Sequence, residues 1–130
     1  MGAASASPAP QVPRETPPGE GVICAWAIYS LVEEVGRRCA PGRYPEAQEE
    51  LRRTVQRLDD YVRANSDFTP EQISRFKSEQ AHIGASEAEL CQGDGLQMFE
   101  SLARIEPGDL SLSIDALVAR PGEPTWGTCL

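Results

Sequence analysis

Hydrophobic residues recur at steps of three and four along most of the chain, a spacing that predicts helices throughout. Over residues 22–38 the apolar positions first surround the helix axis and then keep to one face. A helix that is apolar all round is usually central in a bundle. A second helix is predicted over residues 45–64, whose apolar stripe lies opposite a charged face and is formed by Tyr44, Ala47, Leu51, Val55, Leu58 and Val62.

The strongest start signal in the chain predicts a third helix. Thr69 and Gln72 have the spacing of a capping box, in which each side chain bonds the backbone N–H of the other residue. Pro70 between them stands at the first helical position, where its missing N–H costs nothing. We expect this helix to end at Gly84, because glycine is the residue most often found just past a helix C-terminus.

Two more helices complete the prediction. Ser86 and Glu89 form a second capping box, and apolar residues continue on one face to about residue 105. Gly93 within this stretch predicts a bend or break, because glycine costs about 1 kcal/mol in a helix interior. The last helix is expected to begin with Asp109 as its cap and to stop at Pro121.

These elements predict an all-α protein: a small up-down bundle of four to five helices over residues 22–130, with an extended C-terminal tail. Residues 1–21 are rich in proline, glycine and alanine and are expected to be disordered, because they bury too little apolar surface to offset their ordering entropy. Their Ala-Ser-Ala stretch resembles the region around a signal-peptidase cut. The remnant of an export signal and an ordinary flexible N-terminus both stay open as interpretations.

The net charge and the short apolar runs of the chain disfavour some classes of binding partner. The formal net charge of −8 disfavours binding to nucleic acid or to an anionic membrane. No apolar run approaches the roughly 18 to 20 residues needed to cross a bilayer, so membrane insertion is not expected. Eleven arginines against the single Lys77, with many alanines, prolines and glycines, are typical of a GC-rich bacterial genome.

The four cysteines predict that the protein works in an oxidising compartment. Cys24, Cys39, Cys91 and Cys129 include no Cys-x-x-Cys pair, which disfavours a zinc ribbon or a thioredoxin-like motif. An even number of cysteines in a small acidic domain favours two disulfides and a periplasmic or secreted protein, with four buried free thiols as the main alternative.

Helix geometry selects the pairing. Cys24 and Cys39 lie near opposite ends of one helix, about 22 Å apart, whereas a disulfide needs its Cα atoms within about 7 Å. In an up-down bundle the first helix ends where the fourth begins, which brings Cys39 to Cys91. The predicted bridges are therefore Cys39–Cys91 and Cys24–Cys129, and the second would hold the C-terminal tail, with Trp126, against the first helix.

Few residues suggest catalysis. His82 is the only histidine and lies where the last turn of the third helix is expected, so a role at the helix terminus is favoured over catalysis. Asp94 stands between two glycines but lacks the spacing of a calcium loop and the lysine of a phosphate loop. A helix kink is the better interpretation of that segment.

A charged group on the first helix is the remaining candidate for chemistry. It consists of Glu33, Glu34, Arg37 and Arg38, and a solvated helix face is its favoured interpretation. An enzyme would need one of the glutamates to meet His82, or a residue of another helix, in a cleft. The hypothesis fails if both glutamates face open solvent.

The aromatic residues Trp26, Tyr29 and Trp126 are expected to pack in the core. Trp126 is the exception, because a tryptophan in a proline- and glycine-rich tail is either held against the core or offered to a partner. The predicted Cys24–Cys129 bridge favours the first of these.

The sequence contains no recognisable catalytic, cofactor-binding or metal-binding residues, so we expect a non-enzymatic, exported accessory module that binds a protein of the cell envelope. Inhibitors, immunity proteins and secretion chaperones are of this type, and each predicts an exposed apolar patch. One alternative is a carrier of a small apolar ligand between the first, fourth and fifth predicted helices, which predicts a closed cavity. The other is a small enzyme that uses the Glu/Arg group.

Overall fold

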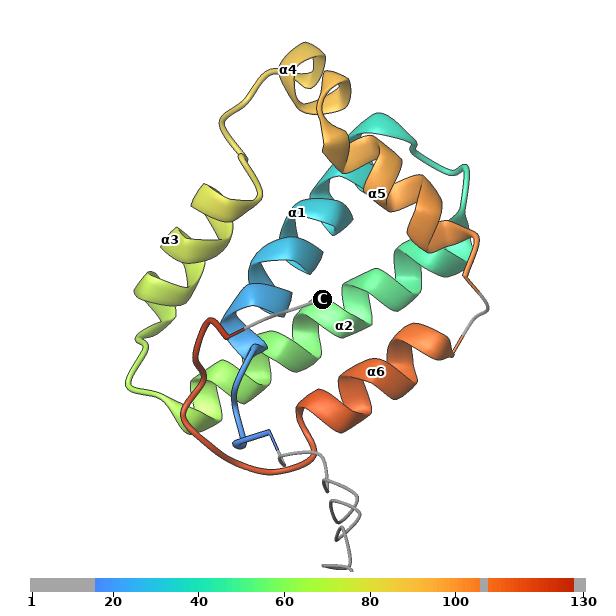
Figure 1. The fold of residues 1–130 in the computed structure, drawn as a ribbon. Coiled ribbons are helices and arrows are strands. Elements are labelled where there is room, and N and C mark those ends of the chain that lie inside the picture. Colours follow the sequence, from blue (N-terminus) through green and yellow to red (C-terminus); the bar gives the residue numbers. More distant parts are fainter. Residues whose placement is uncertain (1–15, 106–107, 128–130) are drawn as a thin grey trace, which may run out of the picture.

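The computed structural model describes residues 16–105 and 108–127, and within them the chain is helical and contains no strand. The all-α class is therefore confirmed (Figure 1). The helices in chain order are α1 (Val22–Cys39), α2 (Pro45–Asn65), α3 (Pro70–Gln80), α4 (Glu87–Gln92), α5 (Asp94–Ala103) and α6 (Asp109–Leu117). The predicted break at Gly93 is confirmed: it divides the fourth predicted helix into α4 and α5, so the described residues form six helices and not four to five.

Helix α1 is central, as its apolar composition predicts. It contacts α2, α3, α4 and α5, and only α6 is held mainly by α2. The side chains of Val22, Trp26, Val32 and Val35 are completely buried at 0% exposure. Because α1 supplies the middle of the core, its far end fixes where α4 and α5 pack.

The up-down topology is wrong for α6. The carboxylate of Glu50, early in α2, accepts hydrogen bonds from the backbone N–H groups of Gly108 and Ser111 at the start of α6. Further along both helices, Arg57 of α2 donates a hydrogen bond to Asp115 of α6 at 2.6 Å. The two helices therefore run in the same direction (Figure 1). The physical reason is the break at Gly93, because α5 is too short to return along the bundle and α6 starts at the end where α2 starts.

The helix starts agree with the sequence fully at α3, in part at α4 and not at α6. Both hydrogen bonds of the capping box between Thr69 and Gln72 are present. At α4 the side chain of Ser86 accepts from the N–H of Glu89, but the side chain of Glu89 does not bond back, so only half of the predicted capping box is formed.

At α6, by contrast, Asp109 is the first helical residue and not the cap. The N-cap is Gly108, with a left-handed φ of 105°, and it offers no side chain. The Glu50 carboxylate from α2 binds the N–H groups that a local cap would have bound.

The predicted bridge between Cys39 and Cys91 is present, with Cα atoms 5.6 Å apart, and it joins the end of α1 to α4. Helix α1 is continuous, which excludes a bridge between its two ends as argued from its length. Cys129 lies outside the described residues, so the pairing Cys24–Cys129 stays a prediction.

The C-terminal segment returns to the start of α1, as the sequence predicts. The N–H of Ile23 donates to the carbonyl of Thr125 at 3.1 Å, and the N–H of Thr125 donates to Gly19 at 3.0 Å. Residues 16–21 were expected to belong to a disordered tail, but in the structure residues 17–20 form a turn against this C-terminal segment. Residues 1–15 lie outside the described residues. Within the described part of the chain, no helix combines the length and the apolar character that a membrane span requires.

Two glycines let α1 and α5 approach closely. A Cβ atom built on Gly36 would lie 2.3 Å from Cε2 of Phe99 and 2.6 Å from Oε1 of Gln48. A Cβ on Gly95 would lie 2.9 Å from Cγ2 of Val35. Phe99 is completely buried, so its ring has no free space into which it can retreat.

Gly36→Ala is therefore expected to lower the free energy of unfolding by about 2 kcal/mol, because overpacking a filled core costs about 1–3 kcal/mol. The direction of the change in stability is informative, since replacing glycine with alanine at an unhindered helical site raises the free energy of unfolding by about 1 kcal/mol. Gly84→Ala, in the turn after α3, is the control for adding a methyl group without a steric clash, because a Cβ there meets nothing within 4 Å. Urea unfolding monitored by circular dichroism measures both. A stabilised Gly36→Ala would show that the two helices are not in this contact.

Candidate functional site

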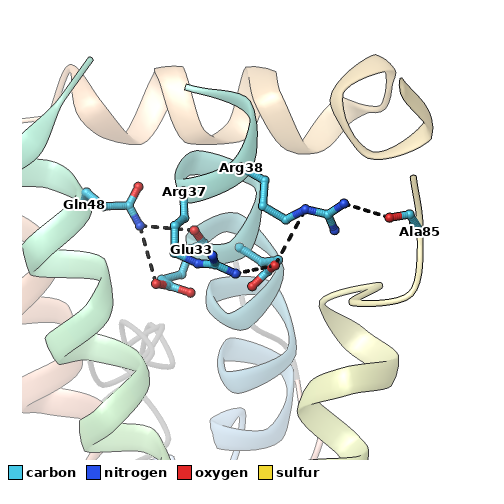
Figure 2. A network of polar contacts seen from close by, with 6 residues as sticks. Glu33, Arg37, Arg38, Gln48 and Ala85 are labelled. Atoms are coloured by element: carbon cyan, nitrogen blue, oxygen red, sulfur yellow. Dashed lines mark hydrogen bonds and ion pairs between the residues drawn. The ribbon is translucent and has the colours of Figure 1, made fainter. Parts of the chain in front are cut away.

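The charged group on α1 is largely used within the fold (Figure 2). Glu34 is buried at 7% exposure and accepts a hydrogen bond from Arg37 at 2.5 Å. The Nε atom of Arg38 lies 3.9 Å from the same carboxylate oxygen. Hydrogen bonding to Glu34 raises the pKa of Arg37, which stays charged. The carboxylate of Glu34 thus lies between two guanidinium groups of its own helix.

Arg38 also connects α1 to the loop that follows α3. Its Nη2 donates to the carbonyl oxygen of Ala85 at 2.8 Å (Figure 2). This bond fixes the loop between α3 and α4 to α1, and the disulfide joins α4 to the end of the same helix. The Nη1 atom of Arg38 is buried and has no hydrogen-bond partner.

Glu33 faces α2. The amide nitrogen of Gln48 donates to its carbonyl oxygen at 3.1 Å and lies 3.5 Å from its carboxylate (Figure 2). Burial raises the pKa of Glu33, and the charge of Glu34 acts in the same direction. The positive charges of Arg37 and Lys77 lower the pKa, but burial is the larger effect.

Glu33→Gln is expected to increase the free energy of unfolding at pH 7. A carboxyl with a raised pKa binds its proton more tightly in the folded state, so its ionisation disfavours folding once the pH exceeds the ordinary value of 4.5. The advantage of the variant should disappear below that pH, where wild-type Glu33 is protonated in both states. Urea unfolding at pH 3.5 and pH 7 tests this, with exposed Glu79→Gln as the control. An equal gain at both pH values would contradict it.

The enzyme hypothesis for this group gains no support from the geometry. Neither glutamate faces open solvent, which was the condition that would have ended the hypothesis, and Glu33 does meet Gln48 of another helix. Within the described part of the chain, however, His82 forms no hydrogen bond or ion pair with Glu33 or Glu34. The observed partners account for the group as a link between α1, α2 and the loop after α3.

His82 lies beyond the end of α3 and not in its last turn. Helix α3 stops at Gln80, and His82 adopts a positive φ of 50°. The N–H of Ile83 donates to the carbonyl of Ser78 and that of His82 donates to Glu79, the two bonds of a Schellman motif. The prediction that Gly84 ends the helix is therefore wrong, because His82 occupies the left-handed position where glycine is usual.

His82→Gly is expected to raise the free energy of unfolding by about 1 kcal/mol, since it removes the steric cost of a left-handed non-glycine residue. His82→Ala keeps that cost and serves as the control, which should show no gain. Thermal unfolding compares the two variants. Equal stability of the glycine and alanine variants would show that position 82 is not left-handed in solution.

Four aromatic residues from α1, the segment before α3, α3 itself and the C-terminal segment form what we call the aromatic cluster: Trp26, Phe68, Phe76 and Trp126. The ring of Trp26 stacks on Phe76 with centroids 4.2 Å apart. Phe68 lies 6.2 Å from Trp26, and Trp126 lies 6.0 Å from Phe76. Trp26 is fully buried, whereas Phe68 is 38% and Trp126 is 54% exposed. The cluster therefore has a buried base and an exposed edge.

A polar network holds the base of the cluster. The indole N–H of Trp26 donates to Asp59 at 2.7 Å, and Lys77 donates to the other oxygen of Asp59 at 2.8 Å. The spacing of α2 suggests that Asp59 pairs with Arg63, but Arg63 lies 3.7 Å from Asp60 instead. Asp59 is buried at 7% exposure, so it serves the interior and not the charged face.

Trp126 combines the two possibilities that the sequence offers. Its ring packs beside Phe76, and the adjacent Thr125 is hydrogen-bonded to Ile23 and Gly19, so the residue is held in place. More than half of the side chain remains exposed. It is thus both attached to the fold and presented at the surface.

Of the surface pockets elsewhere on the described residues, two bear on the hypothesis of a ligand carrier. One of about 370 Å³ lies between α1, α4 and α5 and is lined by Leu31, Val35, His82, Ala85, Glu89, Leu90, Gly93, Asp94, Gly95 and Met98. Another of about 270 Å³ lies between α2, α5 and α6, with Tyr44, Leu102 and Leu110 among its lining residues. Both open to the surface, whereas the carrier hypothesis expects a closed cavity. No group of histidine, cysteine and acidic residues within the described ranges is arranged to hold a metal ion.

Comparison with known proteins adds no assignment: no family model matches the chain, and neither curated proteins nor solved structures include a significant match.

Proposed function

We propose that this protein is an exported, non-enzymatic accessory module that binds another protein of the cell envelope through the exposed edge of the aromatic cluster. The observation that carries the proposal is the exposure of Phe68 and Trp126 on one continuous set of ring contacts. Exposed aromatic residues are enriched in protein interfaces, and tryptophan is over-represented among the residues that dominate binding energy.

The rigidity of the cluster supports this role. Phe76 and Trp26 stack beneath the two exposed rings, and the hydrogen bond to Asp59 fixes Trp26. Side chains that are held before binding lose less conformational entropy on association than free ones. A partner that contacts Trp126 therefore meets a preformed surface.

The disulfide supports export, because such bridges persist in oxidising compartments and are rare in the cytosol. We further propose the second bridge, Cys24–Cys129. The backbone bonds between Thr125 and the start of α1 bring the C-terminal segment to the correct end of that helix. This bridge would hold the segment that presents Trp126. The accessory role covers inhibitors, immunity proteins and secretion chaperones, and the pockets do not favour the alternative of a carrier with a closed cavity.

Site-specific photocrosslinking in the cells that produce the protein tests the proposal. A photoreactive residue at position 126 or 68 is expected to capture one envelope protein, and the same residue at position 112 is the control. Leu112 is 67% exposed but lies on α6, away from the aromatic cluster.

The captured protein is then purified and titrated with wild type, Trp126→Ala, Phe68→Ala and Leu112→Ala. Loss of the Trp126 side chain is expected to weaken binding at least tenfold, since interface residues of this kind contribute about 2 kcal/mol or more. Leu112→Ala should bind as wild type does. Equal capture at all three positions, or equal affinity of all variants, would overturn the proposal.

A further inference from the structure

The pocket between α1, α4 and α5 differs from the aromatic cluster in both place and chemistry. Its floor is apolar and is formed by side chains of three helices: Leu31 and Val35 of α1, Leu90 of α4 and Met98 of α5. Val35 is completely buried and Leu90 is 7% exposed, so the floor belongs to the rigid core. Its volume of about 370 Å³ falls within the range of pockets that bind small organic molecules.

Two of the exposed polar residues that line this pocket are acidic. Glu89 comes from α4 and Asp94 from the start of α5, and His82, on the turn after α3, is the third. No lysine or arginine lines the pocket, and the guanidinium group of Arg38, which donates to the lining residue Ala85, has the carboxylate of Glu34 beside it. The carboxylates of Glu89 and Asp94 and the net charge of −8 of the whole chain favour a positively charged ligand.

These carboxylates are not paired with another side chain of the described residues, although each lies in the first turn of its helix, where a negative charge suits the helix dipole. Within the described residues the side chains of Glu89 and Asp94 have no hydrogen bond or ion pair. A groove between α2 and α6, whose lining includes Glu49, Glu50 and Ser111, shows the contrast. There Glu49 is paired with Arg52 and Arg53, and Glu50 binds backbone N–H groups of α6. The charges of the α2–α6 groove support the structure, whereas those of the α1–α4–α5 pocket remain available.

The walls are fixed before any ligand arrives. The disulfide joins α1 to Cys91, next to Leu90, and Arg38 holds the carbonyl of Ala85. Gly95 permits α5 to lie directly against Val35. A pocket with three anchored walls does not lose binding energy to ordering its own loops.

We propose that this pocket binds a small amphipathic organic cation, with an alkyl or aryl body on the apolar floor and an ammonium group at Glu89 and Asp94. A metal ion does not suit the site, because the described acidic residues and the histidine are not grouped to coordinate one. Charges spread along a rim around an apolar floor instead match a ligand with an apolar body and a single charged end.

A matched series of probes tests whether the pocket requires both the positive charge and the apolar body of the ligand. Octylammonium, 1-octanol and octanoate share the apolar body and differ in charge, and butylammonium has the charge with a shorter body. Isothermal titration is expected to rank octylammonium first, with at least tenfold weaker binding of octanoate and of butylammonium. Amide chemical shifts in nitrogen-15 spectra should change at residues 31–35, 82–95 and 98. If octanoate binds equally, or the shifts lie elsewhere, the proposal is overturned.

Variants separate this site from a general attraction of cations to an acidic surface. Glu89→Gln and Asp94→Asn are each expected to weaken the binding of octylammonium about 2- to 5-fold, the size expected for exposed ion pairs. Glu87→Gln removes a charge from the same helix outside the pocket and should leave binding unchanged. If Glu87→Gln weakens binding as much as Glu89→Gln does, the attraction is general and the site does not exist. The proposal does not depend on the aromatic cluster, because Trp126→Ala should bind octylammonium normally.

Discussion

Trp26→Ala is expected to lower the free energy of unfolding by about 4 kcal/mol, since replacing a fully buried tryptophan with alanine costs about 3–5 kcal/mol. Trp26 has 0% exposure, stacks on Phe76 and donates to Asp59. Its loss leaves a cavity in the core beside α1 and removes one of the two hydrogen-bond partners of the buried carboxylate of Asp59. Because domains of this size have a total stability of about 5–15 kcal/mol, the variant is expected to be close to unfolding.

Urea unfolding measured by far-ultraviolet circular dichroism gives the value without relying on tryptophan fluorescence. Trp126→Ala is the matched control, because it removes the same side chain from a site that is 54% exposed. We expect that control to lose no more than about 1 kcal/mol. Similar losses in the two variants would show that Trp26 is not the buried base of the aromatic cluster.

Trp26→Phe divides the effect into its two causes. Phenylalanine can still stack on Phe76 but cannot donate to Asp59. A loss of about 1–3 kcal/mol is expected from the unsatisfied buried carboxylate oxygen. If Trp26→Phe is as stable as wild type, the hydrogen bond contributes nothing and packing alone explains the role of Trp26.

The parts of the fold that the sequence predicts are those governed by local physics. Helix periodicity depends only on neighbours along the chain, and it places α1 and α2 within about one residue of their observed ends. The capping box at Thr69 and the break at Gly93 are likewise properties of a few adjacent residues. Even the Cys39–Cys91 pairing follows from the length of one continuous helix together with the order of the elements.

The parts that the sequence does not predict depend on partners distant along the chain. Asp59 has a suitable arginine four residues later, yet it binds Trp26 and Lys77, because α1 and α3 bury that side of α2. The start of α6 is capped by Glu50, which accepts a hydrogen bond from the N–H of Gly108 although it lies 58 residues earlier in the chain. No sequence pattern near Asp109 reveals this bond.

The candidate sites also combine features that the local sequence predicts with features that depend on distant parts of the chain. A tryptophan in a proline- and glycine-rich segment signals that Trp126 matters, but the ring contacts with Phe76 need the folded chain. The pocket between α1, α4 and α5 is not visible in the sequence at all, because Leu31, Glu89 and Met98 share no motif or spacing. The break that the glycines around Asp94 predict is present, and the position of Asp94 at the pocket follows from that break.

Replacing both residues of the observed disulfide, Cys39→Ala with Cys91→Ala, is expected to lower the free energy of unfolding by about 4 kcal/mol. In the chain-entropy account a cross-link stabilises by restricting the unfolded state, and the effect grows with loop length. The two cysteines are 52 residues apart, which gives a value between the roughly 3 kcal/mol of a 15-residue loop and the roughly 4.7 kcal/mol of a 100-residue loop. Helix α4 has only six residues, so it is the element most dependent on this bridge.

Urea unfolding of the double variant with and without a reductant measures this bridge and tests the proposed second one. The variant without reductant gives the contribution of Cys39–Cys91 alone. If Cys24–Cys129 is also formed, the reductant should destabilise the variant by a further amount of roughly 4–5 kcal/mol, the value for a 100-residue loop, because that bridge closes an even longer loop. If the reductant has no effect on the variant, the second bridge is absent and Trp126 is held by the backbone bonds of Thr125 alone. If the variant without reductant is as stable as wild type, the unfolded chain is already compact enough that the first cross-link restricts nothing.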